Sequence, residues 1–182
     1  MSRYPIHTIE SAPEPSRPAL EGLQQNFGRI PNLAATMATA PPLINSFVAA
    51  FANFHGSSFD DADKQVLLLT NAVTNRCAWA VAFHSTLALG AGVPADDVTS
   101  IRDGALPSTP RLVALSRLTR TIIEQRGHLA DDDVDQFVAA GFNDTDVLEV
   151  IAGVAVSTMA NYAGNVTHPP LEDPFLAQAW TA

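Results

Sequence analysis

Apolar residues recur every three or four positions along most of this chain, which is the spacing that places them on one face of an α-helix. No segment shows convincing strand-like alternation of apolar and polar residues. Prolines and glycines mark the ends of the periodic segments. The pattern therefore predicts an all-α fold. The predicted helices cover about residues 18–27, 33–40, 43–55, 60–73, 76–90, 110–127, 131–140 and 145–167, with a short helical connector near 94–103.

The longest apolar run lies between residues 59 and 93, and its pattern predicts two helices joined by a polar break at Thr74–Arg76. Asp60 is expected in the first turn of the first helix, where a carboxylate interacts favourably with the helix dipole. Asn75 is expected to be the N-cap of the second helix, because its short side chain can accept a backbone hydrogen bond. This pair of helices contains Cys77, the one cysteine of the chain.

The length of 182 residues suits one domain that buries a core without disulfides or metal ions. The first fifteen residues contain three prolines and few apolar anchors. We therefore predict an extended N-terminal arm over residues 1–15 and a single helical domain over 16–182. Such an arm would suit exchange between subunits.

Two segments of the chain resemble each other weakly. Phe59-Asp-Asp-Ala-Asp precedes an apolar stretch that ends at His84, and Phe142-Asn-Asp-Thr-Asp precedes one that ends at His168. A duplication would imply a pseudo-two-fold helical core, although shared helix-capping needs would produce the same likeness.

The charge of the chain limits its partners. The formal net charge is −9, and no cluster of lysine and arginine is present. Nucleic acids and anionic membranes bind to positive surface, so neither is an expected partner. The N-terminus lacks the apolar core of a secretory signal, and no run reaches about 18 uninterrupted apolar residues. These features predict a cytoplasmic protein.

Cys77 and His84 are the main candidates for chemistry. Cys77 is expected at a helix start, where free backbone N–H groups and the helix dipole favour a thiolate. His84 follows seven residues later on the same face, but roughly 10 Å further along the axis. A direct hydrogen bond between them is not expected, and the residue one turn before His84 is Ala80. The histidines lack the spacing of a metal site, so no metal or cofactor is predicted.

The spacing of these residues resembles the motif of the alkylhydroperoxidase D and carboxymuconolactone decarboxylase superfamily. The redox members of that superfamily carry Glu-x(11)-Cys-x-x-Cys-x-x-x-His, and Leu-x-x-x-Ala-Gly-Val follows His84 here as residues 87–93. Two flanking segments resemble its branch of uncharacterised peroxidase-related proteins: FGRIPNLAATMATAPPLINSFVA (27–49) and ANYAGNVTHPPLEDPF (160–175). The likeness covers most of residues 20–176 and implies an AhpD-like multi-helical domain.

The resemblance assigns candidate catalytic roles to Cys77, His84 and Gln65. Cys77 matches the first motif cysteine and His84 the motif histidine, whereas Ala80 replaces the second cysteine and Gln65 the glutamate. Family members use the two cysteines as a dithiol that reduces peroxide. With one thiol, this chain would be limited to one-Cys reduction of a hydroperoxide, in which an external thiol resets a sulfenic acid, or would have no such activity.

Two other functions remain open from the sequence. A lyase similar to the decarboxylase branch would use His84 as acid and base, with Arg76 or Arg111 anchoring the carboxylate of a small substrate. Alternatively, the chain would be a non-catalytic oligomeric binding protein with Cys77 as an inert core residue. The resemblance implies a homo-oligomer in each case, and a small-molecule substrate if the protein is active.

Overall fold

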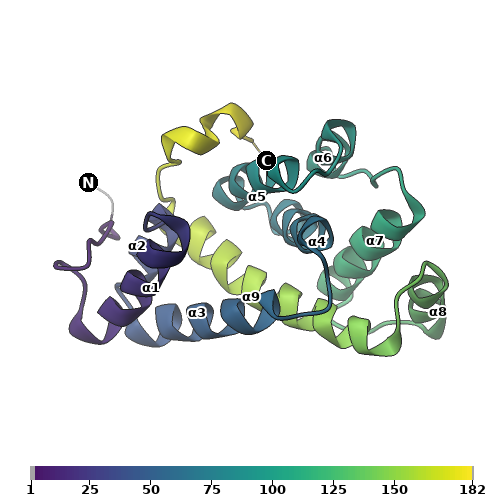
Figure 1. Cartoon of the computed structure of the whole chain (residues 1–182), viewed down its shortest axis with the longest axis horizontal. Coiled ribbons are helices and arrows are strands. Elements are labelled where there is room, and N and C mark those ends of the chain that lie inside the picture. Colours follow the sequence, from purple (N-terminus) through teal and green to yellow (C-terminus); the bar gives the residue numbers. More distant parts are fainter. Residues whose placement is uncertain (1–2, 182) are drawn as a thin grey trace.

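The computed structural model describes residues 3–181, and the elements of this part of the chain are nine α-helices and two 3-10 helices (Figure 1). The described residues contain no strand, which confirms the all-α prediction. Eight predicted helices and the short connector are all present, with ends shifted by a few residues. The elements are η1 (Glu14–Ser16), α1 (Arg17–Phe27), α2 (Asn32–Met37), α3 (Pro41–His55), α4 (Asp61–Thr74), α5 (Ala78–Gly90), α6 (Ala95–Arg102), α7 (Pro110–Glu124), α8 (Asp131–Ala139), α9 (Asp144–Thr167) and η2 (Asp173–Gln178).

The turn between α4 and α5 differs from the prediction. Asn75 is the C-cap of α4 and not the N-cap of α5, because its side-chain amide donates to the backbone oxygen and to the Oδ1 of Asn71. Arg76 then adopts a left-handed backbone with φ of 53°. Cys77 is the N-cap residue of α5, with an extended backbone conformation. The predicted helix boundary was therefore two residues too early.

Helices α4 and α9 form the centre of the fold and run in the same direction. Ser58, just before α4, donates from Oγ to Asp146 Oδ1 in the first turn of α9. At the other end, Asn165 Nδ2 in the last turn of α9 donates to the backbone oxygen of Asn75, the C-cap of α4. A Cβ at Gly153 of α9 would lie 2.7 Å from the Phe54 ring, so the absent side chain lets α9 approach α3 closely. Helix α9 is long and apolar enough to cross a membrane by length and composition alone, but it packs against α2, α3, α4, α5 and α7.

The two similar segments begin alike and then diverge. Asp60 caps α4 by accepting from the backbone N–H of Asp63, and Asn143 caps α9 in the same manner. The rings of Phe59 and Phe142 meet edge to face at 6.0 Å. However, α4 ends at Thr74 after 14 residues, whereas α9 continues for 24. The duplication stays a prediction.

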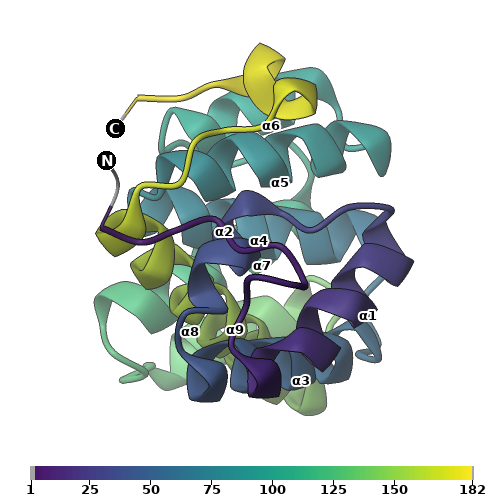
Figure 2. The same ribbon diagram turned by 90° about the vertical axis from the view of Figure 1, so that its left-hand side faces the viewer.

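Both ends of the chain lie against the helical body. The N-terminal arm runs across α2, where the N–H of His7 donates to the backbone oxygen of Ala35 (Figure 2). The C-terminal tail turns back over α5, and Phe175 of η2 is buried against Trp79 and Phe83. Trp180 follows, and its ring N–H donates to the backbone oxygen of Arg102. The predicted exchange of the arm between subunits stays a prediction.

Candidate functional site

Gln65 and His84 form a buried hydrogen bond between the two central helices. Gln65 lies in α4 and His84 in α5, and Gln65 Oε1 is 3.0 Å from His84 Nδ1. An amide oxygen only accepts hydrogen bonds, so this contact assigns the imidazole proton to Nδ1. The second ring nitrogen, Nε2, is then left with a free lone pair. The pair therefore holds the ring in the tautomer that can accept a proton at Nε2.

His84 is uncharged at neutral pH. Its burial lowers the pKa of the imidazole to about 3, with a smaller contribution from the charge of His55. The glutamate of the family motif would oppose this shift by favouring the imidazolium form, whereas the neutral amide of Gln65 carries no such charge. His84 is thus a neutral buried base or hydrogen-bond acceptor.

A small apolar cavity of about 50 Å³ lies beside His84. Trp79, Ala80 and Phe83 of α5 form one wall, and Val156 and Ala160 of α9 form another. Part of the lining also comes from α1, α2, α3 and α4. Ala80 therefore faces the space that a thiol at this motif position would enter. The cavity is suited to a small apolar molecule.

Few polar side chains line this cavity. Besides His84 there is Ser157 of α9, whose Oγ accepts a 3.4 Å hydrogen bond from Asn161 Nδ2. The ring N–H of Trp79 also belongs to a lining residue, but it donates to Glu172 Oε2. His84 is consequently the one titratable group among the residues that line the cavity.

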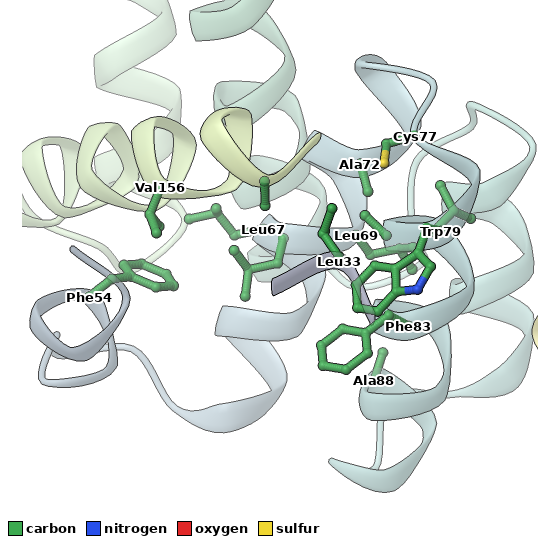
Figure 3. Packing of buried hydrophobic residues seen from close by; sticks show 14 of the residues in the cluster. Leu33, Phe54, Leu67, Leu69, Ala72, Cys77, Trp79, Phe83, Ala88 and Val156 are labelled. Carbon is green, nitrogen blue, oxygen red and sulfur yellow. The ribbon is translucent and has the colours of Figure 1, made fainter. Parts of the chain in front are cut away.

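Cys77 lies in the core and is not among the residues that line the cavity. Its exposed fraction is 1%. A Cβ placed at Gly164 of α9 would be 2.7 Å from Cys77 Sγ, so the sulfur occupies the space left by this glycine. Figure 3 shows Cys77 next to Ala72 of α4, while the stacked rings of Trp79 and Phe83 lie further along α5.

The helix start does not activate the Cys77 thiol. Burial raises its pKa, and the smaller, opposite effect of the backbone N–H groups of Ala80 and Trp79 only partly offsets it. We expected a lowered pKa from the sequence, and the direction is the opposite because desolvation of the thiolate outweighs the helix-start contacts. The three predicted site residues are therefore separated into a Gln65–His84 pair and an isolated thiol.

Neither candidate carboxylate anchor lies at the cavity. Arg111 pairs with Asp63, with Nη2 to Oδ2 at 2.6 Å, and its guanidinium stacks on the ring of Phe142. Arg76 is exposed and lines a separate polar cleft with Arg102 and other residues. The cavity beside His84 thus has no cation among its lining residues. Among residues 3–181, no group of three or more histidine, cysteine, aspartate or glutamate side chains could hold a metal ion.

Sequence reasoning did not identify Ser157 or the aromatic residues of the cavity mouth. Phe27 of α1 and Phe51 of α3 meet there at 5.9 Å between ring centroids, and both belong to the lining. No local motif marks these residues. Their place depends on how α1, α3 and α9 pack, which the helical periodicity alone does not define.

The comparisons with known proteins agree with this geometry. Residues 43–121 match the model of the carboxymuconolactone decarboxylase family. An uncharacterized peroxidase-related protein with an alkylhydroperoxidase AhpD core, from Ralstonia eutropha JMP134, has the same fold with a TM-score of 0.83 and 20% identity, over 97% of this chain and 95% of that chain. Another such protein, from Silicibacter sp. TM1040, has a TM-score of 0.79 and 15% identity, over 97% and 93%. The search of curated proteins finds no match.

The fold is also shared with the debrominase Bmp8. A cysteine-to-alanine variant of Bmp8, solved in complex with 2,3,4-tribromopyrrole, has a TM-score of 0.77 and 17% identity, over 98% of this chain and 97% of that chain. The carboxymuconolactone decarboxylase family model thus matches a segment of this chain, residues 43–121, and the fold of the chain is AhpD-like. The resemblance seen in the sequence is therefore confirmed.

Proposed function

We propose that the cavity beside His84 binds a small, neutral, largely apolar molecule that donates a hydrogen bond to His84 Nε2. His84 would act as the proton acceptor in any reaction at this site, and Cys77 would take no part. The observation that carries the proposal is the position of a buried neutral imidazole on the wall of an apolar cavity, held in one tautomer by Gln65. Its pKa of about 3 keeps the lone pair available at neutral pH.

One-Cys reduction of a hydroperoxide is the second candidate function. It is favoured by the backbone N–H groups of Trp79 and Ala80, whose effect on the Cys77 thiol is to lower its pKa. A sulfenic-acid probe after peroxide treatment tests it directly. Labelling of the folded protein above that of an unfolded control would support it, and no labelling of the folded protein would exclude it. The burial of Cys77 predicts no labelling.

A lyase that acts on a carboxylated substrate is less well supported. Such a substrate would bring its negative charge into an apolar cavity that offers no arginine or lysine. The cost of desolvating the carboxylate would then not be repaid by an ion pair. A neutral substrate fits the same cavity without this cost.

Pyrrole is a suitable probe, because it is small, planar and apolar and has one N–H donor. The debrominase of the same fold was solved with a brominated pyrrole. The matched control ligand is N-methylpyrrole, which lacks the donor. The matched variants are His84→Leu, which removes the acceptor while filling much of its space, and Cys77→Ala, which removes the thiol.

The measurement is a titration followed by the ¹⁵N resonances of the His84 ring and by calorimetry. We expect pyrrole to shift the Nε2 resonance and to bind about tenfold more weakly to the His84→Leu protein, since one hydrogen bond is lost. The Cys77→Ala protein should bind pyrrole as the natural chain does. Equal affinity for both ligands, or unchanged binding to the His84→Leu protein, would refute the proposal.

A further inference from the structure

Three arginine side chains that are far apart in the sequence line one polar cleft of about 570 Å³. Arg76 comes from the turn between α4 and α5, Arg102 from the last turn of α6, and Arg120 from α7. They are three of the ten basic residues in a chain of net charge −9. The fold thus gathers positive charge that is dispersed in the sequence. We call this hollow the arginine cleft.

The guanidinium groups of the arginine cleft lack ion pairs. Asp103 and Glu124 line the same cleft, but neither is paired with an arginine. The side chain of Arg76 also makes no hydrogen bond to any other residue that the structure describes. A guanidinium has five N–H donors, so Arg76 can offer all of them to a bound molecule.

The other two arginines differ in how many of their N–H groups are engaged. Arg120 makes one long contact, 3.4 Å from Nη2 to the backbone oxygen of Ala105. Arg102 is held firmly, because it donates to Ser85 Oγ and to two backbone oxygens of the C-terminal tail. Arg102 therefore fixes a positive charge at the cleft, whereas Arg76 and Arg120 keep most of their donors for a ligand.

The three arginines do not serve as partners of the nearby helix ends. Helices α4, α6 and α7 all end at the cleft, and the C-terminal end of a helix attracts cations. Within residues 3–181, however, none of these guanidinium groups donates to a backbone oxygen in the last turn of those helices. The helix ends oppose an anion, so its binding must depend on direct contacts with the unused N–H groups.

A small oxyanion of charge −2 is the ligand that this arrangement suits. The planar guanidinium group donates two parallel hydrogen bonds to the oxygens of a carboxylate or a phosphate. Two arginines with free donors can hold two sides of such a group, and Trp180 supplies an apolar wall. The volume of the cleft is typical of small-molecule sites. Asp103 and Glu124 would repel an extended polyanion such as a nucleic acid.

We propose that the arginine cleft binds a small dianionic molecule, a phosphate monoester or a dicarboxylate, through the guanidinium groups of Arg76 and Arg120. Arg102 supplies a fixed positive charge beside them. None of the residues that line this cleft also lines the cavity beside His84. The inference is therefore independent of the function proposed for that cavity.

An NMR titration with inorganic phosphate and, separately, with succinate tests the proposal. Of the two tryptophans of the chain, Trp180 lines the arginine cleft and Trp79 lines the other cavity. A dianion should shift the indole N–H resonance of Trp180 in a saturable manner, with that of Trp79 as the internal reference. Sodium chloride holds the ionic strength constant. A response to phosphate alone assigns a phosphate monoester, a response to succinate alone a dicarboxylate, and a response to both assigns dianions in general.

Two pairs of variants separate direct binding from a general loss of charge. Arg120→Gln removes a guanidinium group of the cleft, and Arg117→Gln removes one of the same helix outside the cleft. Arg76→Gly and Arg126→Gly are the second pair, because both arginines have a left-handed backbone, with φ of 53° and 55°, which glycine adopts without strain. The two cleft variants should bind the dianion about tenfold more weakly, and the two controls as the natural chain does.

The outcomes that would overturn the proposal are distinct from misfolding. Circular dichroism and thermal unfolding check each variant, and Arg76→Gly should remain about as stable as the natural chain because its backbone strain is relieved. The proposal fails if neither dianion shifts the Trp180 resonance at about 10 mM. It also fails if chloride at the same ionic strength gives an equal shift, or if the control variants weaken binding as much as the cleft variants.

Discussion

The contact between Cys77 and Gly164 allows a direct test of where the thiol points. A Cβ added at Gly164 would lie 2.7 Å from Cys77 Sγ and 3.5 Å from Leu33 Cδ1. Non-bonded atoms prefer a separation of about 3.5–4.0 Å, so Gly164→Ala would force the sulfur and α9 apart by roughly 1 Å. Overpacking of this kind costs about 1–3 kcal/mol. Alanine in a helix recovers about 1 kcal/mol relative to glycine, so the net destabilisation should be about 0–2 kcal/mol.

The double-mutant cycle separates these two effects. In a Cys77→Ala background the sulfur is absent, so Gly164→Ala should stabilise the protein by about 1 kcal/mol through its helix propensity alone. The coupling free energy should then be about 1–3 kcal/mol. Gly22→Ala in α1 is the control, because a Cβ there meets no atom within 4 Å and its effect should not depend on Cys77. The measurement is urea unfolding followed by circular dichroism. A coupling energy below about 0.5 kcal/mol would show that the sulfur does not occupy this position.

Three further predictions concern ionisable groups. Gln65→Glu should raise the pKa of His84, because a carboxylate beside Nδ1 favours the imidazolium; NMR titration of the ring measures this, and an unchanged pKa would contradict the hydrogen bond between the two residues. The pKa of His84 is about 3 in the folded protein and near 6.5 when unfolded, so the unfolded chain binds a proton that the folded one does not. The free energy of unfolding should therefore fall as the pH drops below about 6.5, by up to ~1.4 kcal/mol per pH unit. Between pH 6.5 and 5 the His84→Leu protein should show a smaller slope in urea unfolding, and an equal slope would be contrary to this reasoning. Arg111→Leu should destabilise the fold by about 1–3 kcal/mol in the same assay, because it removes the ion-pair partner of the buried Asp63 carboxylate, whose pKa is already raised by burial. Arg111 itself is partly exposed, so the loss of unfolding free energy should be smaller than for a fully buried ion pair.

Helical periodicity was sufficient to predict most of the fold. Apolar spacing in segments such as residues 43–55 and 145–167 reports directly on which face of a helix is buried. The exception is the α4–α5 turn, because an asparagine can cap either the end of α4 or the start of α5. In the structure Asn75 caps the end of α4, where it contacts Asn71 of the same helix, and the left-handed backbone of Arg76 then separates it from α5.

The candidate site was predictable in part. The resemblance to the family motif drew attention to Gln65 and His84, and these two residues do hydrogen-bond in the structure. The environment of Cys77 was not predictable, because its neighbour Gly164 comes from a helix almost ninety residues away. The local rule for helix starts favours a thiolate, but long-range packing buries the sulfur and reverses the direction of its pKa. Ser157 was missed for the same reason.

This chain has Gln65 where the family motif has glutamate and Ala80 where it has the second cysteine, and both differences favour a neutral, apolar site in place of a charged, thiol-containing one. A glutamate at position 65 would favour a charged histidine beside a thiol at position 80. With Gln65 and Ala80, both the charge and the second thiol are absent, and the cavity beside His84 is left apolar. The remaining histidine is then a neutral acceptor instead of one half of an ion pair.

The glycines of α9 have a consequence for how the cavity could be redesigned. Gly153 and Gly164 fix the distance of this helix from α3 and from Cys77, and a side chain at either position would push it outward. Val156 and Ala160 lie between them and face the cavity. Substitutions at these two positions should therefore widen or narrow the chamber while the helix backbone keeps its place. Ligand size could be selected by exchanging single side chains on a helix whose spacing is fixed elsewhere.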